Sequence, residues 1–199
     1  MFMKIYNTLS HKEEVFIPWE EGKVSFYTCG PTVYHYAHIG NMRNYIGHDI
    51  LDKTLRFIGF DVTRCMNITD VGHLTSDSDS GDDKMVASAK KEHKSVLDIA
   101  SFYTDAFFKD FDALNCKRPE IVSNATDNID EYIKILTKLL EDGYAYQAGG
   151  NVYFDTSKLK DYYVLTNHKE DDMVVGARES VEYDASKKNQ ADFALWFTK

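Results

Sequence analysis

The sequence predicts an α/β fold built on a parallel, doubly wound sheet, and three observations near the N-terminal end support this. Residues 23–30 (KVSFYTCG) are rich in β-forming side chains and end at a glycine, which is typical of a strand. Apolar side chains then recur at helical spacing from Ile39, and a second β-rich run follows at 60–70. A strand, a helix and a strand in this order open a parallel sheet.

The first helix is expected to begin at Ile39 and to run for about five turns. Gly59 follows it and is expected to close it, as a glycine just beyond the helix end commonly does. Its apolar residues are expected to face the core as one stripe: Ile39, Met42, Ile46 and Ile50, widened by Leu51, Leu55 and Ile58.

Residues 71–84 are polar, acidic and rich in turn formers, so we expect a surface loop there. The aspartates at 76–83 do not form a calcium loop, because the terminal bidentate glutamate is missing. A second helix is expected from around Asp83, and Pro119 breaks the chain after it. Six residues of this helix share one face: Val96, Ala100, Tyr103, Phe107, Phe111 and Leu114.

A compact insertion is expected between two parts of the main domain, giving the organisation 1–116, 117–190 and 191–199. Asp127 or Asn128 can cap its helix, and residues 144–156 predict a β-hairpin that turns at Gly149-Gly150. Residues 191–196 (ADFALW) return to a buried, strand-like run. One stripe of the insertion's helix is apolar: Ile129, Tyr132, Ile133, Leu136, Leu139 and Leu140.

Composition restricts the class of protein. The chain has 199 residues, 43% of them hydrophobic and only 3 proline, which suits one folded domain with a smaller insertion. A net charge of −9 argues against a main nucleic-acid platform, although not against a local basic patch or an ATP site. Three separated cysteines favour reduced thiols or a single metal ligand over a disulfide framework, and no apolar run suits a membrane span. We therefore expect a cytosolic protein without membrane contact.

The segment CGPTVYHYAHIGN (29–41) joins the first strand to the first helix, where open parallel sheets bind ligands. The N–H groups at a helix start attract phosphate, and His38 and Gly40 lie there. The alternative is that His38 only caps the helix and Gly40 only tightens the turn. Cys29 has a structural alternative too, as a buried strand cysteine.

Several motifs in order resemble the cysteinyl-tRNA synthetase family of class I aminoacyl-tRNA synthetases, and they cover essentially the whole chain. They are KIYNTLS (4–10), FYTCGPTVY (26–34), HIGNMR (38–43), NITDVGH (67–73), DDKM (82–85), DFDALN (110–115), GARESVE (176–182) and DFALW (192–196). The segment HIGN (38–41) resembles the HIGH signature of class I enzymes. The resemblance implies the first half of a Rossmann-like nucleotide-binding domain with a small α+β insertion.

The resemblance also implies a reaction. ATP, with Mg²⁺, activates cysteine to cysteinyl-adenylate, and the cysteinyl group is then transferred to tRNA(Cys). His38 and Asn41 correspond to the two histidines of the signature and would stabilise the transition state at the phosphates. Asn41 departs from the signature, because an amide donates a hydrogen bond but carries no charge. Gly30, Thr32 and Gly40 would complete the ATP and adenylate site.

The resemblance further implies that Cys29 is one ligand of a zinc ion that binds the thiolate of the substrate cysteine. Thiolate is a strong zinc ligand and the serine hydroxyl is a poor one. Gly30, Thr69 and Trp196 would line the cysteine pocket; alternatively, Thr69 caps a loop and Trp196 fills core. The remaining histidines match no second ligand and are expected to be solvated or on helix faces: His11, His48, His73, His93 and His168.

Other parts of the family pattern are expected beyond residue 199: the other zinc ligands, the second half of the nucleotide-binding fold, a lysine-rich loop and a tRNA-binding region. The 199 residues alone are therefore expected to be inactive. Two alternatives remain open at this point. One is a stand-alone, non-catalytic binding module, and the other is a related ligase that joins cysteine to an amino sugar.

Overall fold

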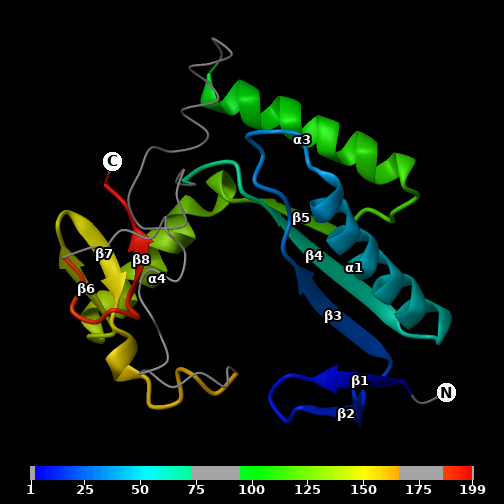
Figure 1. Ribbon diagram of the computed structural model, residues 1–199, viewed down its shortest axis with the longest axis horizontal. Helices are drawn as coiled ribbons and strands as arrows, with labels where there is room; N and C mark the ends of the chain where they lie inside the picture. The colour runs from blue at the N-terminus through cyan, green and yellow to red at the C-terminus, as the bar shows by residue number, and fades with distance from the viewer. Residues whose placement is uncertain (1–2, 73–94, 166–185, 199) are drawn as a thin grey trace. The chain divides into compact units, whose positions relative to one another are not determined.

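The computed structural model describes residues 3–72, 95–165 and 186–198 (Figure 1). Two compact units make up the chain: residues 1–6, 13–73 and 84–128 form the first, and residues 7–12, 74–83 and 129–199 form the second. Most of the loop predicted at 71–84, the helix start predicted near Asp83 and the motifs at 82–85 and 176–182 lie outside the described residues.

The first unit contains a parallel sheet of three strands in the order β3-β4-β5 (Figure 1). Strand β3 (Lys23–Thr28) is followed by helix α1 (Ile39–Phe57) and by strand β4 (Asp61–Ile68). This confirms the predicted strand–helix–strand opening, and the helix begins at the predicted residue. Helix α3 (Val96–Ala113) leads to β5 (Ile121–Asn124), a strand that the sequence pattern did not predict.

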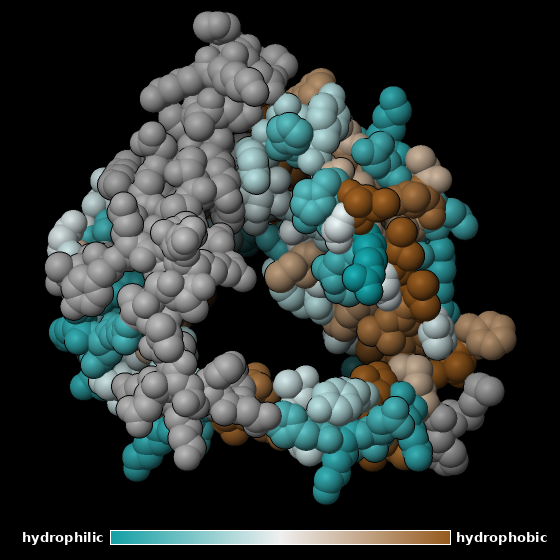
Figure 2. Space-filling model, viewed as in Figure 1, coloured by the Kyte–Doolittle hydropathy of each residue, from teal (hydrophilic) through white to brown (hydrophobic). Residues whose placement is uncertain are grey.

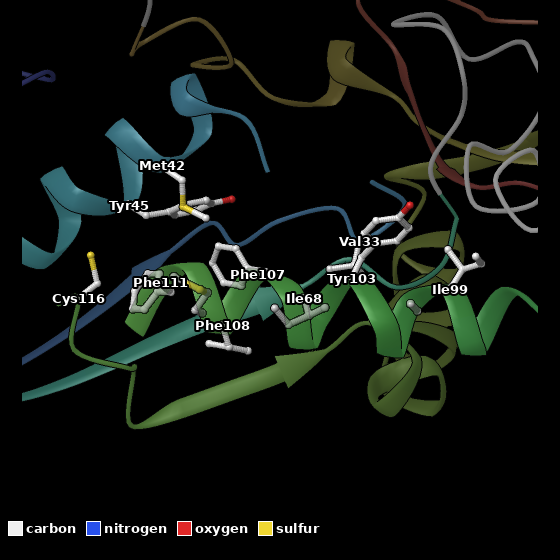
Figure 3. Close-up of a cluster of buried hydrophobic side chains, with 12 residues drawn as sticks. Val33, Met42, Tyr45, Ile68, Ile99, Tyr103, Phe107, Phe108, Phe111 and Cys116 are labelled. Carbon is white, nitrogen blue, oxygen red and sulfur yellow. The ribbon is translucent and has the colours of Figure 1, made fainter. Parts of the chain in front are cut away.

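The core of this unit lies where α1 and α3 pack on the sheet. Met42 and Tyr45 come from α1, and Met66 and Ile68 come from β4. The aromatic side chains of α3 fill the space between them, as Figure 3 shows. Tyr45 and Phe107 meet edge to face with ring centroids 5.0 Å apart, a geometry that aromatic pairs favour. The predicted face of α3 is confirmed apart from Leu114, which is exposed.

The predicted buried stripe of α1 is partly wrong. Ile39 is 89% exposed and Ile50 is 59% exposed, whereas Asp49 and Asp52 are buried. Hydrophobic surface therefore remains visible along α1 (Figure 2). The buried carboxylates are tolerated because they are paired. Asp49 accepts a hydrogen bond from the Lys117 amide (2.7 Å), and Asp52 pairs with Arg56 (3.0 Å).

The ends of α1 and α3 have the same geometry, although only one of them uses glycine. After α1, the Gly59 amide donates to the Arg56 carbonyl and the next amide donates to Leu55, which is the Schellman pattern. Gly59 has φ of 105°, so its predicted role is confirmed. After α3, Asn115 occupies the equivalent position with φ of 56°.

The second unit contains helix α4 (Ile129–Glu141) and an antiparallel sheet, β6-β7-β8. Strands β6 (Ala145–Ala148) and β7 (Asn151–Phe154) form the predicted hairpin, and both turn glycines have positive φ. Strand β8 (Phe193–Trp196) confirms the predicted strand at 191–196, and it pairs with β7. Its predicted burial is wrong, because Phe193 is exposed and the other three residues are half-buried. The apolar stripe predicted for α4 is not buried, because none of its described side chains is fully covered.

Three short features complete the described residues. Strands β1 (Lys4–Asn7) and β2 (Lys12–Val15) pair in a separate two-stranded sheet. Single 3₁₀ turns occupy Thr126–Asn128, just before α4, and Thr156–Lys158 after β7. None of the helices described here has the length and apolar character needed to cross a membrane.

Candidate active site

The first unit brings four predicted site residues to the carboxyl edge of its sheet. The two segments that follow β3 and β4 stay paired through a parallel bridge between Thr32 and Thr69. The Thr69 amide donates to the Pro31 carbonyl (3.0 Å), and the Val33 amide donates to the Thr69 carbonyl (3.1 Å). Cys29, Gly30, Thr32 and Thr69 therefore lie on two adjacent, hydrogen-bonded segments, where open α/β sheets bind ligands.

His38 is the N-cap of α1, in an extended conformation. Its Nδ1 accepts a hydrogen bond from the Gly40 amide (3.1 Å), and the Asn41 Oδ1 accepts one from the His38 amide (3.2 Å). These bonds satisfy amides that a helix start leaves unpaired. Because Nδ1 is an acceptor here, the proton of the neutral ring is on Nε2. Capping and ligand binding are thus compatible, since the cap uses Nδ1 and leaves the Nε2–H of this exposed residue available.

A hollow of about 360 Å³ lies beside this helix start, within the first unit. Two imidazoles border it, and no carboxylate, lysine or arginine does among the described residues. An open N-terminal helix turn beside such a hollow suits an anionic ligand. The lining residues are Gly30, Pro31, Thr32, Tyr34, His35, Tyr36, Ala37, His38, Asn41, Tyr45 and Phe107.

Cys29 exposes its thiol at the end of β3, so the alternative of a buried strand cysteine is wrong. Tyr45 lines the hollow, and its pKa is raised to about 12 by burial and then by the charge of Cys29. All three cysteines are free. Within the described part of the chain, no group of three His, Cys, Asp or Glu side chains could hold a metal ion. Cys29 can supply one ligand, and its role in binding zinc stays a prediction.

Gly30 crosses directly over β4. A Cβ at this position would lie 1.7 Å from the backbone oxygen of Asn67, which no side chain can do. The Gly30 amide donates to the Asn67 Oδ1 (2.9 Å). Glycine is thus required by the close approach of two backbones.

The structure adds two polar residues that the motif analysis did not single out. Asn67 links Gly30 to Thr69 through its amide, and His35 lines the hollow together with His38. The His35 ring stacks on Tyr103 of α3, with centroids 5.9 Å apart. The segment YHYAH contains two histidines three residues apart, which was the available signal for His35. Asn67 on β4 precedes Thr69 by two residues in extended chain, and its Nδ2 lies 3.0 Å from the Thr69 Oγ1.

Trp196 lies in the second unit. It is half-buried on β8 and is paired with Val152 of β7. The buried carboxylate of Asp192 fixes the start of this strand, because it accepts hydrogen bonds from the Thr156 amide (2.9 Å) and the Tyr146 hydroxyl (2.8 Å). A part in a cysteine pocket stays a prediction for Trp196.

Two of the five histidines predicted to have no ligand role can be located. His11 is exposed and has φ of 55°, and His48 lies half-buried on α1. Burial, and then the charge of Arg64, lower the pKa of His48. These positions agree with the expected solvated and helix-face roles. His73, His93 and His168 lie outside the described residues.

Comparisons with known proteins agree with the family resemblance that the motifs indicate. Residues 15–199 match the family model described as tRNA synthetases class I (C) catalytic domain. The chain is 56% identical over its whole length to a protein of Treponema denticola named cysteine–tRNA ligase, of which it covers 40%. Proteins with the same name in Zymomonas mobilis and Treponema pallidum are 50% and 48% identical, over 96% and 100% of the chain, which covers 36% and 39% of them.

The chain thus spans about two fifths of the length of the first of these relatives. Among solved structures, it resembles the LeuRS chain of a LeuRS-tRNA-LeuAMS ternary complex from Agrobacterium radiobacter K84. The TM-score is 0.53 at 20% identity, over 71% of this chain and 18% of the other. This likeness concerns the fold alone, and it agrees with the predicted Rossmann-like α/β class.

Proposed function

Because the chain belongs to the class I (C) tRNA synthetase family, we propose that it supplies the N-terminal catalytic portion of a cysteine–tRNA ligase. The complete enzyme would use ATP and Mg²⁺ to convert cysteine to cysteinyl-adenylate, and would then esterify tRNA(Cys). The observation that carries the proposal is the edge of the first unit, where the exposed Cys29 directly follows β3 and precedes a histidine-capped helix start.

The helix start is proposed to hold the ATP phosphates. His38 would donate from Nε2, because Nδ1 is occupied by the Gly40 amide, and the Asn41 amide group would add a neutral donor. Gly40 keeps this surface open, since a Cβ there would lie 2.9 Å from the His38 ring. Gly30 and Thr32 border the same hollow and would contact the adenylate. These groups act by stabilising charge in the transition state, and the proposal contains no covalent intermediate with the protein.

Cysteine is proposed to bind beside Cys29, Gly30 and Thr69 of the first unit, and a part in its binding is proposed for Trp196 as well. The exposed Cys29 thiol suits a zinc ligand, and the other ligands would come from residues that follow position 199. When bound, zinc would coordinate the substrate thiolate and so select cysteine over serine. The residues of this chain would orient the substrate: Gly30 through its backbone and Thr69 through its hydroxyl.

From the same family membership we propose three segments: a nucleotide-binding half at 1–116, an inserted subdomain at 117–190 and a return into the catalytic domain at 191–199. tRNA would bind mainly through regions outside this chain. A net charge of −9 agrees with a minor part for this chain in binding tRNA. We further propose that the enzyme is cytoplasmic, since its product, the charged tRNA, would be used there in protein synthesis.

The test is cysteine-dependent exchange of pyrophosphate into ATP, measured with the full-length protein that contains this chain. We expect exchange with cysteine and a much weaker reaction with serine. Transfer of the activated cysteine is then measured to tRNA(Cys) and, separately, to an amino sugar. Exchange that does not depend on cysteine would overturn the proposal, and transfer to the sugar alone would establish the related ligase instead.

A further inference from the structure

The side-chain amide of Asn67 connects the two segments that form the proposed cysteine site. Its Oδ1 accepts hydrogen bonds from the Gly30 amide (2.9 Å) and from the Tyr27 hydroxyl (2.7 Å). Its Nδ2 lies 3.0 Å from the Thr69 Oγ1. One side chain on β4 therefore contacts the end of β3 and the residue that follows β4.

The direction of these bonds is fixed by chemistry. A backbone N–H can only donate, so the amide atom that faces Gly30 must be the oxygen. The NH₂ group must then face Thr69, and because it carries no acceptor, the Thr69 oxygen accepts. The hydroxyl proton of Thr69 is consequently directed to another partner. Within the described residues the structure gives it none.

The backbone of Thr69 is also fixed, because its amide and carbonyl bond to Pro31 and Val33. Its hydroxyl is half-buried at the edge that carries the exposed Cys29 thiol. A hydroxyl with a fixed base and one free proton is a directional donor toward that edge. Without the Asn67 donor, the Thr69 proton would not be held toward that edge, and the hydroxyl would discriminate less between ligands.

We propose that Asn67 is a positioning residue that keeps the hydroxyl proton of Thr69 available for donation to the bound amino acid. The inference rests on the proposed function, because it requires the amino acid to bind at this edge. It assigns to Thr69 one role, donation to an electron-rich atom of the substrate, and to Asn67 the task of enforcing it. Asn67 does not touch the substrate.

Asn67→Asp is the informative variant, because it changes hydrogen-bond direction with little change in shape. One carboxylate oxygen would still accept from Gly30 and Tyr27. The other oxygen replaces the donor beside Thr69, so the Thr69 hydroxyl must now donate to it and present only lone pairs to the substrate. Thr69→Val removes the hydroxyl, and Thr69→Ser retains it. Tyr27→Phe is the matched control, since it removes one bond to Asn67 and leaves Gly30 and Thr69 unchanged.

The measurement is cysteine-dependent ATP–pyrophosphate exchange by the full-length protein, with separate KM values for cysteine and ATP. We expect Asn67→Asp and Thr69→Val each to raise the KM for cysteine about tenfold, the value of one hydrogen bond. The KM for ATP should change less than about twofold. The double variant should be no worse than Thr69→Val alone, because the two changes remove the same bond. Tyr27→Phe should resemble the wild type, and Thr69→Ser, which retains the hydroxyl, should recover most of the cysteine affinity that Thr69→Val loses.

The double variant separates the proposal from a simple effect of the added charge. Multiplicative losses in Asn67→Asp/Thr69→Val would mean that the carboxylate acts independently of Thr69, and would overturn the inference. Wild-type cysteine binding by Thr69→Val would overturn it as well, even if Asn67→Asp failed to fold. A wild-type protein without cysteine-dependent exchange would instead refute the proposed function, and the inference with it.

Discussion

His38 has two tasks at one position, and they can be separated by substitution. Its Nδ1 caps α1 through the Gly40 amide, and its Nε2 is left for the proposed phosphate contact. His38→Ala should remove both functions. It should slow adenylate formation and lower the free energy of unfolding by about 1 kcal/mol, the usual value of a lost cap. Exchange kinetics and urea unfolding of the same preparation measure the two effects.

His38→Asn is the matched variant for this prediction, because asparagine caps helices well and does not reach as far. We expect it to retain the unfolding free energy and still lose exchange activity. If His38→Ala lowers the unfolding free energy while both variants keep normal exchange, His38 caps the helix and has no part in catalysis.

Cys29 is the second residue with a separable role. Cys29→Ser in the full-length protein should lower zinc content and weaken cysteine activation, because a hydroxyl is a poor zinc ligand. Zinc content is measured by elemental analysis after gel filtration. Cys65→Ser is the control, since Cys65 is a half-buried thiol on β4 whose main-chain carbonyl, not its sulfur, accepts from Thr28. An unchanged metal content in Cys29→Ser would remove Cys29 from the ligand set.

Single residues also mark how far the sequence could predict the site. Gly30, Thr32, His38 and Asn41 lie in one contiguous segment, whose resemblance to the class I signature singled them out, and all four border one hollow. Asn67 was missed because its partners Gly30 and Tyr27 belong to another strand. Asn67 lies near Tyr27 and Gly30 because β3 and β4 pair in a parallel register that sets Tyr27 opposite Cys65. The sequence of one strand alone does not specify that register.

Helix α1 shows at the scale of an element how strongly its end is specified. Gly59 has φ of 105°, and a Cβ added there would meet open space, with no atom within 4 Å. The cost of Gly59→Ala is therefore conformational, about 1 kcal/mol or somewhat more, with no contribution from steric contact. Thermal or urea unfolding of the full-length protein would measure it.

Gly47 is the natural control for this prediction. It lies within the same helix, has no positive φ and has equally open surroundings. Gly47→Ala should therefore stabilise the protein by about 0.5 to 1 kcal/mol, since alanine is the better residue inside a helix. Equal destabilisation by both substitutions would mean that a factor other than backbone conformation determines the cost at Gly59.

The same helix shows where a periodic pattern misleads. Apolar residues at helical spacing predicted its length and start, but the buried face is rotated toward Tyr45, Asp49 and Asp52. Periodicity gives every carboxylate a surface position, and it cannot anticipate that the Lys117 amide would bond to Asp49 and that Arg56 would pair with one oxygen of Asp52. Ile39 and Ile50 are exposed as a consequence, because they lie on the side of the helix that faces away from the sheet when this face is buried.

At the scale of the whole chain, local signals predicted the parallel unit and the hairpin, while long-range pairing remained hidden. Strand β5 is short, follows Pro119 and carries two exposed apolar residues, so it has neither the alternation nor the length of a typical strand signal. It joins the sheet because β4 supplies its partners, from Cys65 to Ile68. Such a strand is determined by tertiary structure and not by its own four residues.

The entry to β5 provides a prediction for the stability of the first unit as a function of pH. Glu120 joins three segments: it accepts from the Arg56 side chain (2.8 Å) and from the Arg64 amide (2.9 Å), and it pairs with Lys117. Burial alone would raise its pKa. The hydrogen bonds from Lys117 and from the Arg64 backbone outweigh burial and hold the pKa of Glu120 at about 2, below its ordinary 4.5.

A carboxylate whose pKa is lower in the folded state stabilises the fold above its unfolded pKa. The contribution of Glu120 should therefore be complete above pH 4.5 and be lost as the pH falls from 4.5 toward about 2. Its side chain is 32% exposed, so solvent screening reduces the effect to roughly 1 to 2 kcal/mol. Glu120→Gln keeps an acceptor for the Arg64 amide but has no charge to titrate. The variant should be less stable at neutral pH, and urea unfolding should show the difference from wild type shrinking through this window. A difference that stays constant from neutral pH to about pH 3 would mean that the ion pairs of Glu120 do not contribute to folding stability.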